Sequence, residues 1–164
     1  MRGRSGNRGR CTYPCRDFCH VEERLKDGFA FSMKDLALGP DIKALRNAGV
    51  AGFKIEGRKK SSLYVATVVN YYRRMLDGDL TVPEAKELEA QMKTVFSRPW
   101  TQFAFHSRAA QHVVDRDMVG HRGMPIGKVE RTERKRAGET VLRFKTDREL
   151  ERHDGLQIDL ADAQ

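Results

Sequence analysis

The chain has 164 residues, of which 39% are hydrophobic and 33% are charged, a balance typical of a folded globular protein rather than a disordered one. Its 31 lysines and arginines outnumber the 23 aspartates and glutamates, which gives a formal net charge of +8 and favours a polyanionic partner, above all nucleic acid. No apolar run approaches the roughly 20 residues of a membrane-spanning helix, and the basic N-terminus lacks the apolar segment of a secretory signal.

The first 28 residues form a loop segment rich in glycine, arginine and cysteine. Arginine supplies all of its charged side chains up to Asp17, the first acidic residue. A loop of this kind is normally carried by a scaffold that positions it. Contact with phosphate or RNA is one interpretation of these cations, and a basic surface that only keeps the protein in solution is the other. Under the first interpretation the nucleic-acid-binding residues are Arg4, Arg8, Arg10 and Arg16.

All three cysteines lie in the same segment, as Cys11, Cys15 and Cys19. An odd number of closely spaced cysteines favours free thiols or metal ligation in a reducing, cytoplasmic setting over disulfides. The neighbouring arginines would stabilise thiolates. A zinc site normally shows a second pair of ligands downstream, and an iron–sulfur cluster normally takes four cysteines. The spacing alone therefore leaves the nature of the site open.

Predicted strands and helices alternate after this loop. Residues 29–33 read as a short buried strand, residues 41–48 as a helix that ends at Gly49, and residues 50–55 as a second strand. A longer helix follows, capped by Ser61 or Ser62 and ended by Gly78. Its expected apolar stripe consists of Val65, Val68 or Val69, Tyr72, and Met75 or Leu76. This order predicts two βα units with parallel strands.

A third helix is predicted from a capping box over residues 81–84 to Phe96, with a core face of Leu88, Met92 and Val95 or Phe96. Beyond Ser97 the pattern changes to short strands separated by glycine turns, over residues 126–129, 140–145 and 156–160. A second basic cluster lies in this part, at Arg131, Arg134, Lys135 and Arg136.

The sequence therefore predicts an α/β chain in three parts. These are the loop segment over residues 1–28, the last βα units of an incomplete (β/α)8 barrel over residues 29–97, and a small antiparallel β-barrel-like domain over residues 98–164. A parallel sheet is covered on both faces, and a closed (β/α) barrel needs eight strands. We therefore expect the chain to be the C-terminal part of a larger protein, whose N-terminal barrel half is missing here.

Two short segments place charged residues at strand ends, where α/β proteins build their active sites. The first contains Lys34 and Asp35, and the second contains Lys54, Glu56 and Arg58. Strand periodicity puts Lys54 and Glu56 on one face. These five residues are the predicted substrate contacts, and a structural ion pair at the barrel rim is the alternative for the second group. The sequence shows no Ser-His-Asp, Cys-His or His-Glu-x-x-His arrangement, so the catalytic residues are unknown.

Taken together, these blocks resemble peptidase family U-32, the collagenase-like peptidases. The resemblance is carried by residues 3–11 with 14–16, residues 32–36, and residues 54–61 with Tyr64 and Val65. Residues 122–129 resemble the opening of the family's C-terminal β domain. Two positions depart from the family pattern: Ala37 stands where many relatives have cysteine, and residues 98–101 read Arg-Pro-Trp-Thr in place of Arg-Gly-Phe-Thr.

The resemblance implies a (β/α) barrel followed by a small β domain. Some family members are described as collagenase-like proteases, and others act in hydroxylation of tRNA bases, rRNA bases or the ubiquinone ring. Several carry an iron–sulfur cluster on four cysteines. By motif match, Cys11 and Cys15 correspond to two of these ligands, the upstream pair has no counterpart, and Cys19 matches no family position.

Three functions follow as hypotheses. The parent protein is an iron–sulfur-dependent protein of tRNA or rRNA base hydroxylation, with RNA as its partner and no membrane association. The alternative is a collagenase-like peptidase of unknown catalytic type. The third hypothesis is an inactive fragment that binds nucleic acid. The basic loops and the cysteines favour the first hypothesis for the parent protein, and the missing barrel half favours the third for this chain alone.

Overall fold

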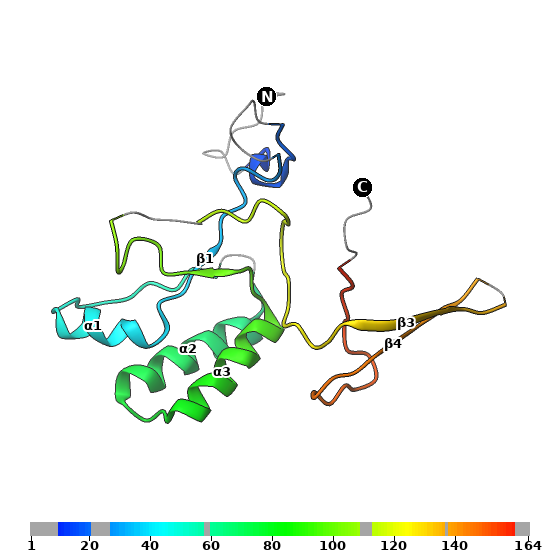
Figure 1. The fold of residues 1–164 in the computed structure, drawn as a ribbon. Helices are drawn as coiled ribbons and strands as arrows, with labels where there is room; N and C mark the ends of the chain where they lie inside the picture. Colours follow the sequence, from blue (N-terminus) through cyan, green and yellow to red (C-terminus); the bar gives the residue numbers. More distant parts are fainter. Residues whose placement is uncertain (1–9, 21–26, 58–59, 109–112, 137, 160–164) are drawn as a thin grey trace. The chain divides into compact units, whose positions relative to one another are not determined.

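The computed structural model describes residues 10–20, 27–57, 60–108, 113–136 and 138–159 (Figure 1). Its internal contacts divide the chain into two compact units, Met1–Arg122 and Gly123–Gln164. Residues 98–122 belong to the first unit. The division into three parts at residues 28 and 97 stays a prediction.

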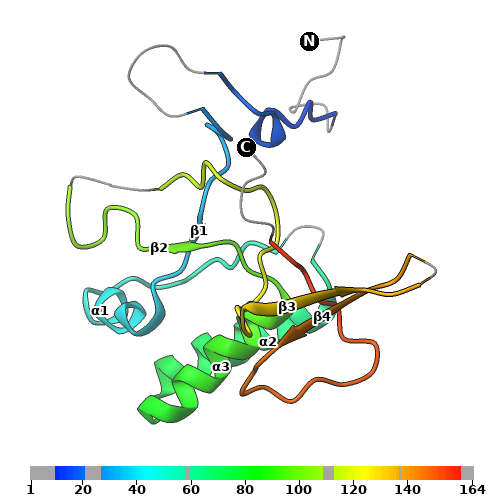
Figure 2. The same cartoon turned by 45° about the vertical axis from the view of Figure 1, so that its right-hand side comes forward.

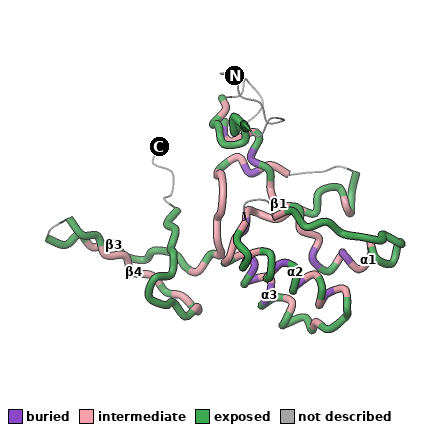
Figure 3. Tube along the Cα trace, turned by 180° about the vertical axis from the view of Figure 1, so that it is seen from behind, coloured by how far each residue is buried: buried purple, intermediate pink, exposed green. Residues whose placement is uncertain are grey.

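Helices form the core of the first unit. Helices α2 (Ser62–Asp77) and α3 (Val82–Val95) run side by side in opposite directions, and the short α1 (Ile42–Asn47) packs against α2 (Figures 1 and 2). The buried hydrophobic residues lie where these helices face one another, and Tyr71 is fully buried (Figure 3). The core cluster consists of Ile42, Val68, Tyr71, Met75, Leu88 and Met92.

Both predicted ends of α2 are confirmed. The Ser61 hydroxyl accepts a hydrogen bond from the backbone N–H of Tyr64 at 3.2 Å, and Gly78 ends the helix with φ of 87°. Such a positive φ suits glycine, which has no Cβ to clash. The predicted apolar stripe is only partly right, because Val65 and Val69 are 45% and 44% exposed. The buried face instead follows Val68, Tyr71 and Met75, whose spacing of three and four residues aligns them toward α3.

The capping box at the start of α3 is also confirmed. The Thr81 hydroxyl accepts from the Glu84 N–H at 3.5 Å, and the Glu84 carboxylate accepts from the Thr81 N–H at 2.9 Å. Pro83 lies in the first turn, where a missing N–H does no harm. The capping box therefore provides hydrogen-bond partners for backbone N–H groups at the start of the helix.

The two predicted strands of the first unit are wrong. Residues 29–33 contain a turn, and β1 (Asp35–Leu36) forms just beyond them. It pairs in parallel with β2 (Trp100–Thr101), a segment that the sequence did not predict as a strand. Residues 50–55 are irregular and exposed. A strand needs a hydrogen-bonded neighbour, and β1 finds that neighbour in β2 rather than in residues 50–55.

The predicted barrel remnant is therefore not visible as two parallel βα units. The described residues contain helices and two small sheets, with no closed barrel among them. The broader assignment to an incomplete (β/α)8 barrel stays a prediction.

A set of partly buried polar contacts fixes the segment just before β1. The Ser32 hydroxyl donates to the Met118 carbonyl at 3.0 Å, and the Asp115 N–H donates to the Ser32 carbonyl at 2.7 Å. The buried Asp115 carboxylate accepts two hydrogen bonds from the Arg122 guanidinium, at 2.9 and 2.8 Å. This bidentate geometry is the strong form of an ion pair. The two hydrogen bonds to Ser32 hold this part of the chain against the segment that leads into β1, and the ion pair ties Asp115 to Arg122.

The second unit contains an antiparallel hairpin of β3 (Val129–Arg134) and β4 (Thr140–Phe144). β3 begins at the last residue of the strand predicted over residues 126–129, and β4 confirms the strand predicted from Thr140. Residues 156–159, the described part of the third predicted strand, are irregular. The backbone at Gly127 lies so close to the Lys145 carbonyl that a Cβ would collide with it. The described part of this unit contains no helix.

Among the described residues, no helix combines the length and the apolar character needed to cross a lipid bilayer.

Candidate functional site

Asp35 is the predicted site residue with the most defined surroundings. It lies on β1 and accepts two hydrogen bonds from Arg98, one from the backbone N–H at 2.9 Å and one from Nε at 2.7 Å. The two side chains are 26% and 37% exposed. Arg98 follows α3 and precedes β2, so the pairing of β1 with β2 brings the two residues together. The result is a half-buried carboxylate held from two directions.

Lys60 and Tyr64 complete a group that we call the Asp35 cluster, consisting of Asp35, Lys60, Tyr64 and Arg98. The Lys60 ammonium lies over the faces of the Phe96 ring and of the Tyr64 ring, 5.8 Å from the centroid of the latter. Burial lowers the pKa of Lys60 and the Arg98 charge lowers it further, whereas Asp35 raises it. Burial, followed by the Asp35 charge, raises the pKa of Tyr64.

His121 extends the aromatic side of this cluster. Its ring stacks on Phe96 with 5.1 Å between centroids and an interplanar angle of 17°. The Ser97 N–H donates to Nδ1 of His121 at 2.9 Å. The same nitrogen lies 3.2 Å from the Ser97 carbonyl oxygen, so the ring contacts both backbone groups of that residue.

The Asp35 cluster combines two cations, one paired carboxylate and the Tyr64 ring, and it lies beside the stacked rings of Phe96 and His121. Perturbed pKa values with a specific charge partner are typical of ligand sites, although structural ion-pair networks also produce them. Aromatic faces accept planar rings by stacking, and cations neutralise phosphate. The chemistry of this cluster suits a planar, anionic ligand better than an extended apolar one.

The other predicted substrate contacts lie apart from this cluster. Lys34 donates its backbone N–H to Val113 at 2.9 Å, and its ammonium forms no ion pair within the described ranges. Lys54 and Glu56 pair with each other at 2.9 Å, with side chains 86% and 72% exposed. This contact raises the pKa of Lys54. The remaining predicted contact, Arg58, lies outside the described residues.

The cysteine loop is built around a tight turn. Tyr13 has φ of 57° and leads into the 3-10 helix η2 (Pro14–Arg16), which carries Cys15. The Tyr13 N–H donates to the Cys11 sulfur at 3.3 Å. Cys11 and Cys15 are exposed.

Cys19 differs from these two cysteines. It is half-buried, its backbone exchanges two hydrogen bonds with Gly28, and its thiol donates to the Asp17 carbonyl at 3.6 Å.

Cys11 and Cys15 fit part of an iron–sulfur ligand set. Both sulfurs are accessible, and a backbone N–H bonded to the Cys11 sulfur is one of the contacts that tune such clusters. A four-iron cluster takes four cysteines. The described part of the chain contains no group of three or more histidine, cysteine, aspartate or glutamate residues that could hold a metal ion. The loop would thus supply two ligands to such a cluster, and the other ligands would have to come from elsewhere.

The described arginines of this loop lie at the surface. Arg10 and Arg16 are both exposed, and the Arg16 guanidinium lies over the Tyr13 ring at 5.3 Å. Neither forms an ion pair within residues 10–20 and the other described ranges. Arg4 and Arg8 lie outside the described residues.

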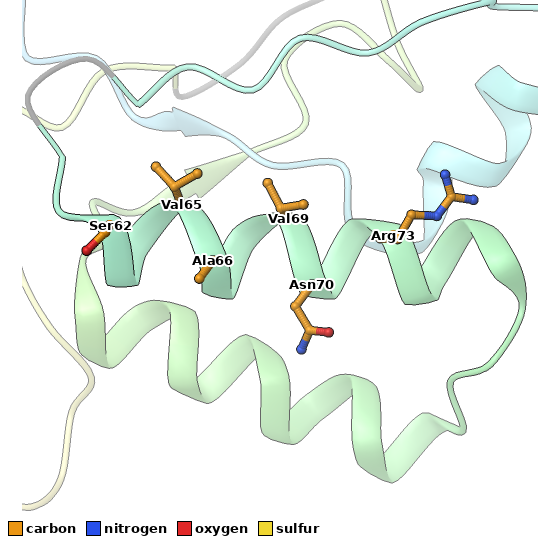
Figure 4. Close-up of a pocket in the computed structure, with 6 residues that line it drawn as sticks. All are labelled: Ser62, Val65, Ala66, Val69, Asn70 and Arg73. Atoms are coloured by element: carbon orange, nitrogen blue, oxygen red, sulfur yellow. The ribbon is translucent and has the colours of Figure 1, made fainter.

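A hollow of about 630 Å³ lies on the exposed side of α2 (Figure 4). Val65 and Val69 point to the same side of the helix, and Arg73, at one end, pairs with Asp77. The hollow contains no free acid, base or nucleophile suited to catalysis. The residues that line it are Ser62, Val65, Ala66, Val69, Asn70 and Arg73.

Sequence reasoning missed Lys60 and Arg98 as site residues. Lys60 stands in a Lys-Lys-Ser run directly before the cap of α2, where a cation is easily read as solvent-exposed. Arg98 was interpreted only as part of an altered turn. Its position one residue before Pro99, in a segment that extends into β2, was the available signal.

Residues 1–115 match the sequence model of Peptidase family U32, and the chain belongs to this family. Among curated proteins it is similar to the 23S rRNA 5-hydroxycytidine synthase of Escherichia coli, with 33% identity over 150 residues and 77% of the chain covered. It is 39% identical over 97 residues to a tRNA hydroxylation protein of Bacillus subtilis, with 51% covered. A collagenase of Porphyromonas gingivalis is 32% identical over 103 residues, with 57% covered.

These similarities span 22%, 22% and 28% of the three relatives, so the chain corresponds to between a fifth and a third of their length. No solved structure matches the chain.

Proposed function

We propose that this chain belongs to a protein that takes part in hydroxylation of tRNA or rRNA bases in the cytoplasm. The observation that carries the proposal is the similarity to the rRNA hydroxycytidine synthase over 77% of the chain. The exposed arginines beside the cysteine loop and the net charge of +8 support an RNA partner. The exposed thiols suit a reducing compartment.

In this proposal each group of residues has its own task. Cys11 and Cys15 would hold one side of an iron–sulfur cluster, which would supply electron transfer when bound. Arg10 and Arg16 would neutralise RNA phosphates, and the Arg16–Tyr13 stack offers a flat surface to a base. The Asp35 cluster, with Lys54 and Glu56, would contact the RNA near the base to be modified.

A peptidase is the second candidate, because the similarity to the collagenase is 32%. Two histidines pair with carboxylates, His20 with Asp27 at 2.8 Å and His106 with Asp41 at 2.9 Å. Neither imidazole hydrogen-bonds a serine hydroxyl or a cysteine thiol within the described part of the chain. A nucleophile activated by a histidine needs that contact. The geometry therefore supports RNA hydroxylation better than hydrolysis of a peptide.

The test is the nucleoside content of tRNA and rRNA in the source organism, measured by mass spectrometry. Deletion of the coding sequence should remove a nucleoside that is one oxygen heavier than its unmodified form. Expression of the wild-type sequence should restore this nucleoside, whereas the Cys11→Ser variant should not. The Cys19→Ser variant, which changes a thiol turned toward the nearby backbone, should also restore it. An unchanged set of hydroxylated nucleosides after deletion would overturn the proposal.

A further inference from the structure

The β3–β4 hairpin concentrates positive charge in the second unit. Residues 128–145 contain seven lysines and arginines against three glutamates, whereas residues 146–159 contain two arginines against five acidic residues. The unit is therefore polarised, with a basic hairpin and an acidic C-terminal segment. No residue of β3 or β4 is buried, so this charge is on the surface.

One cross-strand pair on this hairpin is unfavourable in isolation. Arg131 stands directly opposite Arg143 in the antiparallel register. Like charges at directly opposite positions destabilise a sheet. Both guanidiniums share one carboxylate, that of Glu133, each at 3.2 Å. Two cations on one anion leave a positive charge that an external anion could neutralise.

The turn of the hairpin adds further unneutralised cations. Arg134, Lys135 and Arg136 are consecutive, and none forms an ion pair within the described part of the chain. The Lys135 N–H donates to the Glu139 carbonyl at 2.8 Å, at the end of the hairpin that carries these side chains. Lys145, near the base, has a separate acidic neighbour, Glu130 at 3.5 Å.

We propose that this hairpin is a second RNA-binding element, which contacts the phosphate backbone through Arg131 and Arg143 on one face and through Arg134, Lys135 and Arg136 at the turn. The proposal rests on the proposed function for the identity of the polyanion. The phosphates of an RNA backbone carry regularly repeated negative charges, which can neutralise this row of cations. Because the contacts are to phosphate, the hairpin positions RNA without reading its sequence.

The experiment measures binding of the 164-residue chain to a short single-stranded polyuridine at increasing salt. Arg134→Ala with Arg136→Ala should weaken binding and flatten the slope of log K against log salt by about 1.4, since each lost contact removes about 0.7. The matched control, Arg148→Ala with Arg152→Ala, removes the same charge from the acidic segment of the same unit and should leave the slope unchanged. Arg134→Lys with Arg136→Lys should retain the wild-type slope.

A second variant separates binding from folding. Arg143→Gln removes the like-charge contact with Arg131, so it should keep or raise the melting temperature while weakening polyuridine binding. A merely structural role would move both quantities in the same direction. The inference is overturned if the turn variant and its control have the same slope. It is also overturned if polyglutamate displaces bound polyuridine from the chain as effectively as unlabelled RNA does.

These outcomes are distinct from those of the proposed function. A chain that binds RNA through the hairpin while hydroxylated nucleosides persist after deletion would contradict only the hydroxylation proposal. Loss of the modification with no effect of the hairpin variants on binding would contradict only the hairpin inference.

Discussion

Two lysines of the first unit have surroundings that move their pKa values in opposite directions. Burial and Arg98 lower the pKa of Lys60, whereas Glu56 raises that of Lys54. We predict that a titration followed by NMR of the lysine side chains finds Lys60 deprotonating below the ordinary pKa of 10.5 and Lys54 above it. Because folding depresses the pKa of Lys60, its contribution to stability should increase as the pH rises through its folded-state pKa toward 10.5.

The carboxylate of Asp35 opposes this shift, so its removal should enlarge it. In Asp35→Asn, Lys60 should lose its proton at a lower pH than in the wild type, while Lys54 should not change. Equal shifts of both lysines, or none, would show that Asp35 and Lys60 do not interact in solution.

At the scale of elements, the capping box of α3 offers a direct test of local stability. Thr81→Ala removes the hydroxyl that accepts from the Glu84 N–H, and should lower the free energy of unfolding by about 1 kcal/mol. Urea denaturation measures this loss. Thr94→Ala, near the other end of the same helix, serves as the control and should change the free energy less.

The same box predicts a dependence on pH. Hydrogen bonds from Thr81, together with Arg74, lower the pKa of Glu84 from 4.5 to about 2. The stabilisation that follows from this shift is fully present above pH 4.5 and is lost as the pH falls toward 2. Glu84→Gln should therefore flatten the pH dependence of the unfolding free energy in that range. An unchanged profile would contradict the assigned contacts.

Adjacent valines on α2 test which of its faces is in the core. Val68 is 7% exposed and Val69 is 44% exposed. Val68→Ala should destabilise the protein by about 2 kcal/mol because it removes buried methyl groups, and Val69→Ala by at most about 0.5 kcal/mol. Melting temperatures of the two variants, compared with the wild type, decide the point. A larger loss of stability in Val69→Ala than in Val68→Ala would contradict the observed packing of α2.

The helix ends could be predicted from sequence because their signals are local. Ser61, Thr81 and Gly78 act on the backbone of their own turn, and each does what its residue type indicates. The strands could not be predicted, because a strand depends on a partner elsewhere in the chain. β1 pairs with residues 65 positions further along, at a Trp-Thr segment that shows no strand pattern of its own.

The residues of the candidate site likewise fall into those that could be predicted from the sequence and those that could not. Asp35 was predicted from a motif, and the cysteine loop from its composition. Lys60 and Arg98 reach Asp35 only through the packing of β1 against β2 and of Phe96 against Tyr64, which no spacing in the sequence records. Lys54 and Glu56 were predicted to share a strand face. They do contact each other, although residues 50–55 form no strand.

At the scale of the whole molecule, the ligand count predicts the metal content of the chain. Cys11 and Cys15 offer two of the four cysteines that a four-iron cluster takes. Purified anaerobically, the 164-residue chain should therefore hold iron well below four per chain, and Cys11→Ser should remove what is held while Cys19→Ser should not. Iron analysis and absorption spectra measure this. Four irons per chain in a monomer would refute the prediction.

A parallel assay separates the two family activities. The chain should not cleave gelatin, because no histidine activates a nucleophile in its described part. Gelatin cleavage that persists in Cys11→Ser and in Lys54→Ala would support the peptidase alternative, with a site other than those described.

The central claim is that this protein acts on RNA through the cysteine loop and the Asp35 cluster. The most direct test is ultraviolet cross-linking in living cells, followed by mass spectrometry of the attached peptides and sequencing of the attached RNA. We predict that tRNA or rRNA is attached, and that the modified peptides contain Tyr13 or Tyr64, the aromatic residues that stand beside the cations of these two sites. Absence of cross-linked RNA, or attachment only at peptides outside residues 10–20 and 60–64, would contradict the account.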